Sequence, residues 1–334
     1  MVQFNNNEQL DALVKEAAKV KSSTPGFINV VNFNDYVEQG KQMEPPVEFF
    51  KHVIVENEVT IFFGDTGVGK SIFALQMANE VAMQGKRVMY VNFELSQQQW
   101  AKRYPSKQFP STLSIANIDY SKMHDVTDQA LILDEIQRRM LENDIEVVFI
   151  DNLTNLCVNS KDGNEAGNIM LKLLSLRMNQ KLTMVVIAHV PKRKAGDPYS
   201  LNDLAGSKVL SNYADNVVAI NKSKKDKSMR YLIQLKFRSF PIELDCKNVQ
   251  ELMMTESDGW LHFEYGGYSE ETEHLPRSRD EKVEMEREIL KELKVPNGLS
   301  YRDIADKVGT SLGMVQRVAK NYGLCRKAEK NVKK

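Results

Sequence analysis

The feature that most constrains this chain is a glycine-rich turn, GDTGVGKS, at residues 64–71. It follows an apolar run, EVTIFF, and precedes a segment with helical apolar spacing, so the sequence predicts a strand, a tight loop and a helix. Backbone N–H groups of such a loop bind phosphate at the helix N-terminus. We therefore predict a nucleotide phosphate site, whose residues are Gly64, Asp65, Thr66, Gly67, Val68, Gly69, Lys70, Ser71 and Ile72.

Three side chains around this loop have chemical reasons to be there. Lys70 is placed to reach the β- and γ-phosphates, and the Ser71 hydroxyl is a ligand for Mg²⁺. Asp151 ends the apolar run IEVVFID, where its carboxylate can hold the same metal ion, although an aspartate that caps a turn is the alternative. The sequence thus predicts ATP and Mg²⁺ as cofactors.

A further carboxylate, Glu94, ends the segment RVMYVNFE. In open α/β sheets ligands bind outside the carboxyl ends of the strands, so Glu94 is expected at the edge that carries the phosphate loop. There it can orient or deprotonate an attacking water molecule. Glu94 and Lys70 are therefore predicted catalytic residues.

Strand-like and helical segments alternate as far as His189, which predicts a mostly parallel sheet with helices on both faces. Beyond it, DNVVAINKS, RYLIQLKFRS, PIELD and WLHFEY read as short strands of an antiparallel extension. The predicted organisation is a lead-in at 1–45, an α/β domain at 46–265, a linker at 266–280 and a small all-α domain at 281–334.

The small domain is expected to be a winged helix or a helix-turn-helix. Ile304, Ala305 and Val308 share one helix face, Gly309 supplies a turn, and a second amphipathic helix follows. From Ser300 to the end there are nine basic and three acidic residues, a charge of +6. We therefore predict contacts to duplex DNA, with a protein-interaction module as the alternative. The predicted contact residues are Gln316, Arg317 and Lys320.

The composition of the 334 residues is that of an ordinary globular protein, with 42% hydrophobic and 27% charged residues. No apolar run approaches the length needed to cross a bilayer, and the three cysteines match no metal-binding or redox spacing. We expect a cytoplasmic protein that has no membrane partner.

The phosphate loop, Glu94 followed by LSQQQWAKR, Asp151 and the strand end AH together resemble the RecA-like ATPases over roughly residues 49–263. Among these the chain is most similar to the hexameric replicative helicases of DnaB-like and RepA type. The resemblance implies that Glu94 is the general base, that Arg103 supports the nucleotide site and that His189 senses the γ-phosphate. An exposed helix face for Arg103, and a satisfied polar group for His189, are the alternatives.

The same resemblance implies a site shared between subunits. Lys236 and Arg238, two residues apart on one strand face, would reach the γ-phosphate of a neighbouring subunit, although two such cations are more often a solvated face. Cations on two loops would grip single-stranded DNA in a central channel, unless they serve solubility alone. They are Lys161, Lys192, Arg193 and Lys194.

These features predict a ring-forming, ATP-hydrolysing DNA motor, a replicative-type helicase or single-strand-dependent ATPase that assembles as a homo-hexamer. The alternative is a DNA-binding regulator or replication initiator in which ATP is a switch. A small-molecule kinase is less well supported, because no arginine-rich lid segment is found and the basic C-terminal segment would have no purpose.

Overall fold

The structure is a computed structural model of the chain. The chain divides into two compact units, Met1–Pro45 and Pro46–Lys334. The described residues are 28–119, 129–152, 163–190, 197–204, 208–276, 279–296 and 298–324.

Helix α2, Phe33–Lys41, is the described element of the first unit. Its N-cap is Asn32, whose side chain accepts a hydrogen bond from the Asn34 backbone N–H, as expected where helical N–H groups lack partners. None of the nine residues of this helix is buried, and Phe33 and Tyr36 are exposed. Among residues 28–45, the described part of its unit, this helix therefore packs on no buried core.

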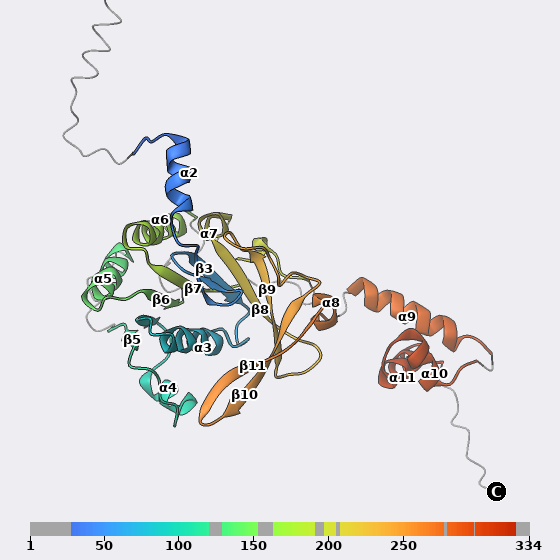
Figure 1. Cartoon of the computed structure of the whole chain (residues 1–334). Helices are drawn as coiled ribbons and strands as arrows, with labels where there is room; N and C mark the ends of the chain where they lie inside the picture. Colours follow the sequence, from blue (N-terminus) through green and yellow to red (C-terminus); the bar gives the residue numbers. More distant parts are fainter. Residues whose placement is uncertain are drawn as a thin grey trace, which may run out of the picture. The chain divides into compact units, whose positions relative to one another are not determined.

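One nine-stranded sheet forms the body of the second unit (Figure 1), in the order β11-β10-β9-β8-β3-β7-β6-β4-β5. From β8 to β5 neighbouring strands are parallel, and from β8 to β11 they are antiparallel. The predicted parallel sheet with an antiparallel extension is confirmed. In sheet order the strands are Trp260–Ser269, Val249–Ser257, Met229–Lys236, Asn216–Lys222, Val59–Gly64, Thr183–His189, Val147–Asp151, Val88–Asn92 and Leu113–Asn117.

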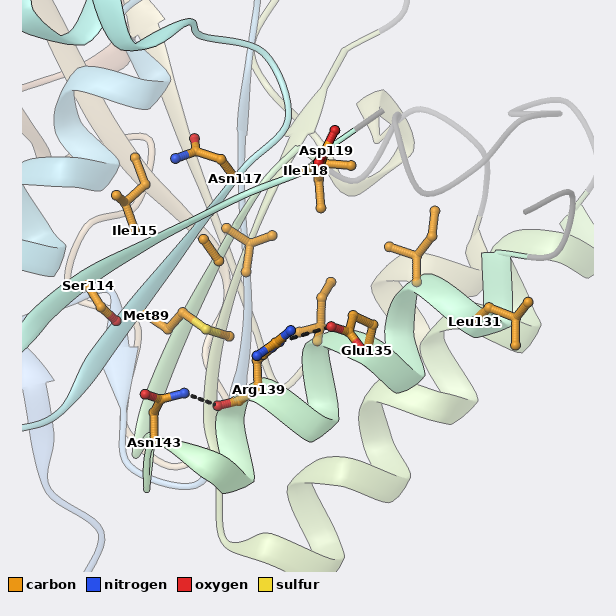
Figure 2. A pocket seen from close by; sticks show the side chains of 14 residues that line it. Met89, Ser114, Ile115, Asn117, Ile118, Asp119, Leu131, Glu135, Arg139 and Asn143 are labelled. Carbon is orange, nitrogen blue, oxygen red and sulfur yellow. Dashed lines mark hydrogen bonds and ion pairs between the residues drawn. The ribbon is translucent and has the colours of Figure 1, made fainter. Parts of the chain in front are cut away.

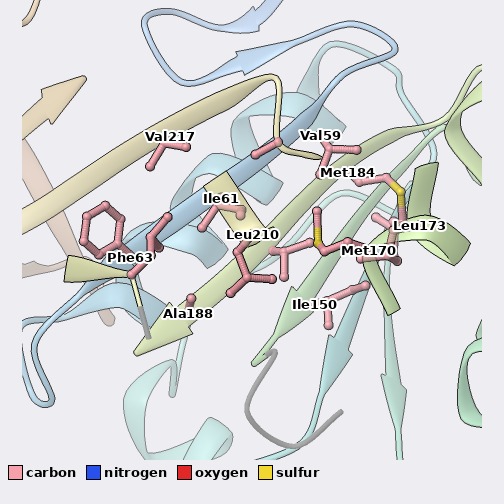
Figure 3. Packing of buried hydrophobic residues seen from close by; sticks show 14 of the residues in the cluster. Val59, Ile61, Phe63, Ile150, Met170, Leu173, Met184, Ala188, Leu210 and Val217 are labelled. Carbon is pink, nitrogen blue, oxygen red and sulfur yellow. The ribbon is translucent and has the colours of Figure 1, made fainter. Parts of the chain in front are cut away.

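Helices cover both faces of the parallel strands. Side chains alternate along a strand, so Phe62 packs in the cluster that contains helix α3 (Lys70–Met83), while Ile61 and Phe63 pack on the opposite face. Figure 3 shows this opposite cluster, to which three helices contribute. Because both faces are covered, every residue of β3 and β6 is buried. The three helices are α5 (Gln129–Glu142), α6 (Gly163–Gln180) and α7 (Lys208–Tyr213).

Four short elements accompany the parallel half. Strands β1 (Glu48–Phe50) and β2 (Ile54–Val55) form a small antiparallel sheet. Helix α4, Gln97–Arg103, begins after Ser96, which forms a capping box with Gln99. A 3₁₀ turn, η3, spans Leu201–Asp203.

One predicted strand of the antiparallel extension is wrong. PIELD, residues 241–245, is not a strand, and the true neighbour of β9 is β10, Val249–Ser257. Pro241 has no N–H to give, and the Gln234 side chain accepts the N–H groups of Glu243 and Leu244. The prediction missed β10 because its sequence, VQELMMTES, is poor in the β-branched and aromatic residues that mark strands.

The predicted linker also differs from the structure. Strand β11 continues to Ser269, past the predicted domain edge at 265, and helix α8 follows at Glu271–His274. Glu271 and His274 are buried, and the two His274 ring nitrogens lie 2.7 and 2.8 Å from the Ser269 and Ser223 hydroxyl oxygens. Part of the predicted linker therefore belongs to the folded body, where these two polar side chains are buried.

Three C-terminal helices pack around their own apolar cluster, α9 (Arg279–Leu293), α10 (Tyr301–Val308) and α11 (Leu312–Asn321). Gly309 ends α10 in the left-handed region, at φ 65°, and Ser311 caps α11 by accepting the Met314 N–H. Over the described residues 279–296 and 298–324 this module has no strand, so no wing is seen there. The buried members of the cluster are Ile289, Leu293, Ile304, Ala305, Val315, Val318 and Ala319.

Candidate functional site

The glycine-rich turn links β3 to α3, with Gly69 as the N-cap of the helix. Gly69 has φ 104°, and a Cβ there would lie 2.8 Å from the Phe263 ring, so only glycine fits. Gly67 also has positive φ, at the exposed tip beside Thr66. A Cβ on Gly64 would collide with the Ile220 carbonyl on β8. The loop is therefore held against the antiparallel half of the sheet.

The Lys70 ammonium group is folded back onto this loop. It donates to the carbonyl oxygens of Gly64 (2.9 Å) and Asp65 (3.0 Å), and it lies 3.2 Å from His189 Nδ1. Burial lowers the pKa of Lys70 to about 8, against the opposing charges of Asp151 and Glu94. Because a buried ammonium is costly, a phosphate group that replaced these neutral acceptors would stabilise the charge.

Asp151 ends β6 with its carboxylate buried. Burial raises its pKa, while hydrogen bonds from Ser71 and Tyr90 lower it. Tyr90 donates from its hydroxyl over 2.7 Å to Asp151 Oδ2, and burial raises the pKa of Tyr90 well above its ordinary value. Carboxylate and hydroxyl oxygens are the ligands that Mg²⁺ prefers, so the paired Ser71 and Asp151 side chains fit the predicted metal site.

Glu94 and His189 meet at the same edge of the sheet, through a residue that the sequence analysis missed. The Asn152 amide nitrogen hydrogen-bonds Glu94 Oε1 and lies 3.0 Å from His189 Nε2. His189 Nε2 is itself 3.4 Å from Glu94 Oε1. With the Lys70 contact, these side chains form one continuous polar chain from the phosphate loop to Glu94. The only available signal for Asn152 was its place directly after Asp151.

Two other residues that support the loop were also missed. Tyr199 accepts the Asp65 N–H at its hydroxyl oxygen over 3.2 Å. Arg230, from β9, donates its Nε–H over 2.8 Å to the Val68 carbonyl. Both lie far along the chain from the loop, so no local pattern could have identified them.

The remaining predicted nucleotide-site residues lie around this edge. Ile72 is partly buried against the cluster that contains α3. Arg103 is the last residue of α4, and its positive charge acts to lower the pKa of Tyr90, which burial raises. Arg103 is thus close enough to influence the tyrosine that holds Asp151.

Lys236 and Arg238 have partners within their own subunit. Lys236 Nζ donates to the carbonyl oxygens of Ser211 (2.9 Å) and Ala214 (2.6 Å), at the C-terminal end of α7, and burial lowers its pKa. Arg238 Nη1 pairs with Asp215 Oδ1 at 2.8 Å, and Arg177 pairs with the other oxygen of that buried carboxylate. The two cations therefore support α7 and the start of β8 in the isolated chain.

The predicted nucleic-acid contacts divide into two groups. Lys161, Lys192, Arg193 and Lys194 lie outside the described residues. Gln316, Arg317 and Lys320 are exposed on α11, on the side opposite the buried Val315 and Val318.

Figure 2 shows a cavity of about 720 Å³ between the edge strand β5 and helix α5. Ser114 and Asn117 of β5 and Leu131 of α5 are among its lining residues, as is the Glu135–Arg139 pair of α5. None of the predicted nucleotide-site residues lines it. The cavity is therefore separate from the phosphate site.

The sheet order places β7 between the phosphate-loop strand β3 and the Asp151 strand β6, with Glu94 at the end of β4. A phosphate loop with these acidic residues on this strand order defines a P-loop ATPase of RecA-like fold. The chain belongs to the AAA domain family, whose model matches residues 29–195.

Curated relatives are DNA repair proteins named RadA. The protein of Chlamydia muridarum is 24% identical over 201 residues, 60% of this chain and 41% of the relative. That of Synechocystis is 25% identical over 227 residues, 64% of this chain and 43% of the relative. The chain thus spans about two fifths of the length of these relatives.

Among solved structures, a KaiC-like protein from Pyrococcus horikoshii aligns with a TM-score of 0.49 and 15% identity, over 66% of this chain and 98% of that one. Within the described residues, no helix combines the length and apolarity required to cross a membrane.

Proposed function

We propose that this chain hydrolyses ATP with Mg²⁺ and couples the hydrolysis to work on DNA. The observation that carries the proposal of hydrolysis is the continuous polar chain from Lys70 through His189 to Glu94, whose carboxylate Asn152 also holds. A loop that only bound Mg²⁺ and a nucleotide would use Asp151 but would need no second carboxylate linked to its phosphate-binding lysine.

Binding would begin with an exchange of partners at Lys70. Its ammonium group would leave the Gly64 and Asp65 carbonyls for the β- and γ-phosphate oxygens, which are charged acceptors and therefore stronger. Ser71 and Asp151 would hold Mg²⁺, which offsets the phosphate charge when bound.

Glu94 would then act as the general base. It accepts a proton from water as the water oxygen bonds to the γ-phosphorus and the bond from that phosphorus to the β-phosphate oxygen breaks, so that ADP and phosphate leave. His189, whose Nε2 is 3.4 Å from Glu94 Oε1, would sense the bound γ-phosphate and transmit its presence to Glu94. Arg103 would support the nucleotide from the end of α4.

Two facts support a DNA substrate. The curated relatives are named DNA repair proteins, and Gln316, Arg317 and Lys320 are exposed on α11 of the C-terminal module. In the motor form of the proposal, Lys161 and Lys192–Lys194 grip single-stranded DNA in the channel of a homo-hexameric helicase, and α11 contacts duplex DNA.

In a ring, Lys236 and Arg238 would complete a neighbour's site. Each would first have to leave its partner in its own subunit, the α7 carbonyls for Lys236 and Asp215 for Arg238. A neighbour's γ-phosphate is a stronger acceptor than a carbonyl, which makes the exchange at Lys236 favourable.

The second candidate function is an ATP-switched DNA-binding regulator or replication initiator. The observation that favours it is the α10–Gly309–α11 unit, in which a capped helix follows a left-handed glycine turn, as in helix-turn-helix modules. A cytoplasmic location is part of both candidates and stays a prediction.

Hydrolysis and particle mass test the proposal first. A DNA motor should hydrolyse ATP faster with single-stranded DNA and form a ring-sized particle with ATP. Glu94→Gln should lower hydrolysis to a small residual rate, whereas Glu256→Gln, at an exposed glutamate of β10, should leave the rate unchanged. A hydrolysis rate that DNA does not change, together with a monomeric particle mass, would contradict the motor form.

A second experiment separates the two candidates. Arg317→Glu with Lys320→Glu reverses charge on the exposed face of α11, and Lys291→Glu on α9 makes a control charge reversal elsewhere in the same module. A regulator should lose most of its affinity for duplex DNA only with the α11 changes. A motor should keep DNA-stimulated hydrolysis on generic single strands with either change.

A further inference from the structure

We infer that Asn152 is the positioning residue for Glu94: its amide holds the carboxylate at the sheet edge in the orientation that hydrolysis needs. This inference rests on the proposed hydrolysis. It concerns a residue that no sequence motif marked, and its effect on the reaction would pass through Glu94.

Backbone register brings the two side chains together. β4 and β6 are parallel neighbours in which Asn92 is opposite Asp151, and the last bond between them joins the Phe93 N–H to the Asp151 carbonyl over 2.9 Å. In this register Phe93 is opposite Asn152, and Glu94 follows one residue further on. Glu94 and Asn152 therefore leave the paired ends of two adjacent strands at the same edge of the sheet.

Hydrogen-bond chemistry then fixes which group donates to which. The Lys70 ammonium has only protons to offer, so His189 Nδ1 must accept and the ring proton lies on Nε2. Nε2–H therefore donates toward Glu94 Oε1, and so does the Asn152 amide. The 3.0 Å between the Asn152 amide nitrogen and His189 Nε2 is then a contact between two donors, not a hydrogen bond. Among the described contacts, two donors converge on Oε1, which leaves Oε2 as the acceptor for a proton from water.

The burial of the two side chains shows which of them is the support. Asn152 is 1% exposed, whereas the Glu94 side chain is 42% exposed. An exposed glutamate alone would sample several rotamers, and a fixed amide donor reduces that freedom at the sheet edge. When Lys70 turns to phosphate, His189 loses one partner, while the amide of Asn152 can keep its hold on Glu94.

The test replaces Asn152 by leucine, which keeps the shape but removes the donor. We expect kcat to fall roughly ten- to a hundredfold, the size for one lost hydrogen bond to a charged group. Nucleotide affinity and KM should stay within about twofold, because Asn152 is not placed on the phosphates. Asn152→Gln keeps an amide, so its kcat should lie between those of the wild type and Asn152→Leu. Asn152→Asp places a charge that repels Glu94, so its kcat should be lower than that of Asn152→Leu.

The control is Asn79→Leu, another buried asparagine, which donates to Met83 Sδ in the C-terminal half of α3. It should leave kcat unchanged. If Asn152→Leu lowers kcat no more than this control, or if Asn152→Gln recovers nothing while both proteins bind nucleotide normally, Asn152 does not position Glu94.

Combination with Glu94→Gln separates the inference from the proposal beneath it. If Asn152 acts through Glu94, Asn152→Leu should lower the residual rate of Glu94→Gln by less than about twofold. An equal loss in both backgrounds overturns the inference. If Glu94→Gln loses hydrolysis while Asn152→Leu keeps the wild-type kcat, the inference about Asn152 is overturned but the proposed function stands. If Glu94→Gln keeps full activity, the proposed function itself is overturned.

Discussion

At the phosphate site, side chains that follow β4, β6 and β7 are linked to Lys70 through polar contacts between residues far apart in the chain. In the C-terminal module, by contrast, Ser300 and Ser311 cap their own helices and Gly309 turns the chain between them. The first region is polar and buried and has long-range contacts. The second has an apolar core and local turn signals, so the two should respond differently to substitution.

The largest expected effect is at Lys70. Lys70→Met should lower hydrolysis a hundredfold or more, because a preorganised cation on the transferred phosphate is lost. The folded chain should not lose stability, since the ammonium is buried and its pKa is lowered to about 8. Hydrolysis rates and thermal melts of the wild type and Lys70→Met check both statements. A large fall in the melting temperature of the variant would contradict the claim that the buried ammonium does not stabilise the fold.

The second prediction concerns the module core. Ile304→Ala removes a fully buried side chain and should cost about 2–5 kcal/mol of the module's stability. Leu312→Ala, at an exposed position of α11, should cost far less. Hydrogen exchange of α10 and α11 measures the loss, and ATP hydrolysis without DNA should be unchanged. A matching loss of hydrolysis would show that the two regions are coupled.

The third prediction is a pH dependence at the phosphate site. The unfolded chain keeps the Lys70 proton up to about pH 10.5, whereas the folded chain releases it from about pH 8. The unfolded state binds more protons in this window, so the free energy of unfolding should rise with pH by up to about 3 kcal/mol. Denaturant unfolding of the wild type and Lys70→Met across this window checks the sign, because the rise should be missing from the variant.

The fourth prediction compares two glycines of one loop. Gly69→Ala places a Cβ 2.8 Å from the Phe263 ring at φ 104° and should cost about 2–4 kcal/mol. Gly67→Ala meets no atom within 4 Å and should cost only about 1 kcal/mol for its positive φ. If chemical denaturation shows equal losses of unfolding free energy for the two variants, the contact between Gly69 and Phe263 of β11 does not shape the loop.

The smallest effect is expected at Tyr199. Tyr199→Phe removes the acceptor of the Asp65 N–H and should cost about 1 kcal/mol, with a few-fold weaker nucleotide affinity. Tyr322→Phe, at an exposed tyrosine, should change neither quantity. Calorimetric nucleotide titration can distinguish the affinities of the two variants. Identical affinities would show that Tyr199 does not contribute to the nucleotide site.

The sequence predicted the parts of the site that have local signatures. GDTGVGKS between a strand and a helix, Asp151 at the end of an apolar run, and Glu94 at another strand end were all visible as patterns. Asn152, Tyr199 and Arg230 were not, because asparagine, tyrosine and arginine occur widely and only sheet register or long-range packing brings them to the loop. β10 was missed for a related reason, since its residues take their strand character from β9 and β11.

By itself the sequence determined the alternating strands and helices, the glycine turn that suits phosphate, and the capped C-terminal helices, because these depend on apolar spacing and on the conformational freedom of single residues. Only the tertiary structure decided that Lys236 and Arg238 support α7 and β8 within their own subunit, and that Asn152 joins Glu94 to His189. The physical reason is that a hydrogen bond is set by distance and direction between atoms, and those follow from how the strands align.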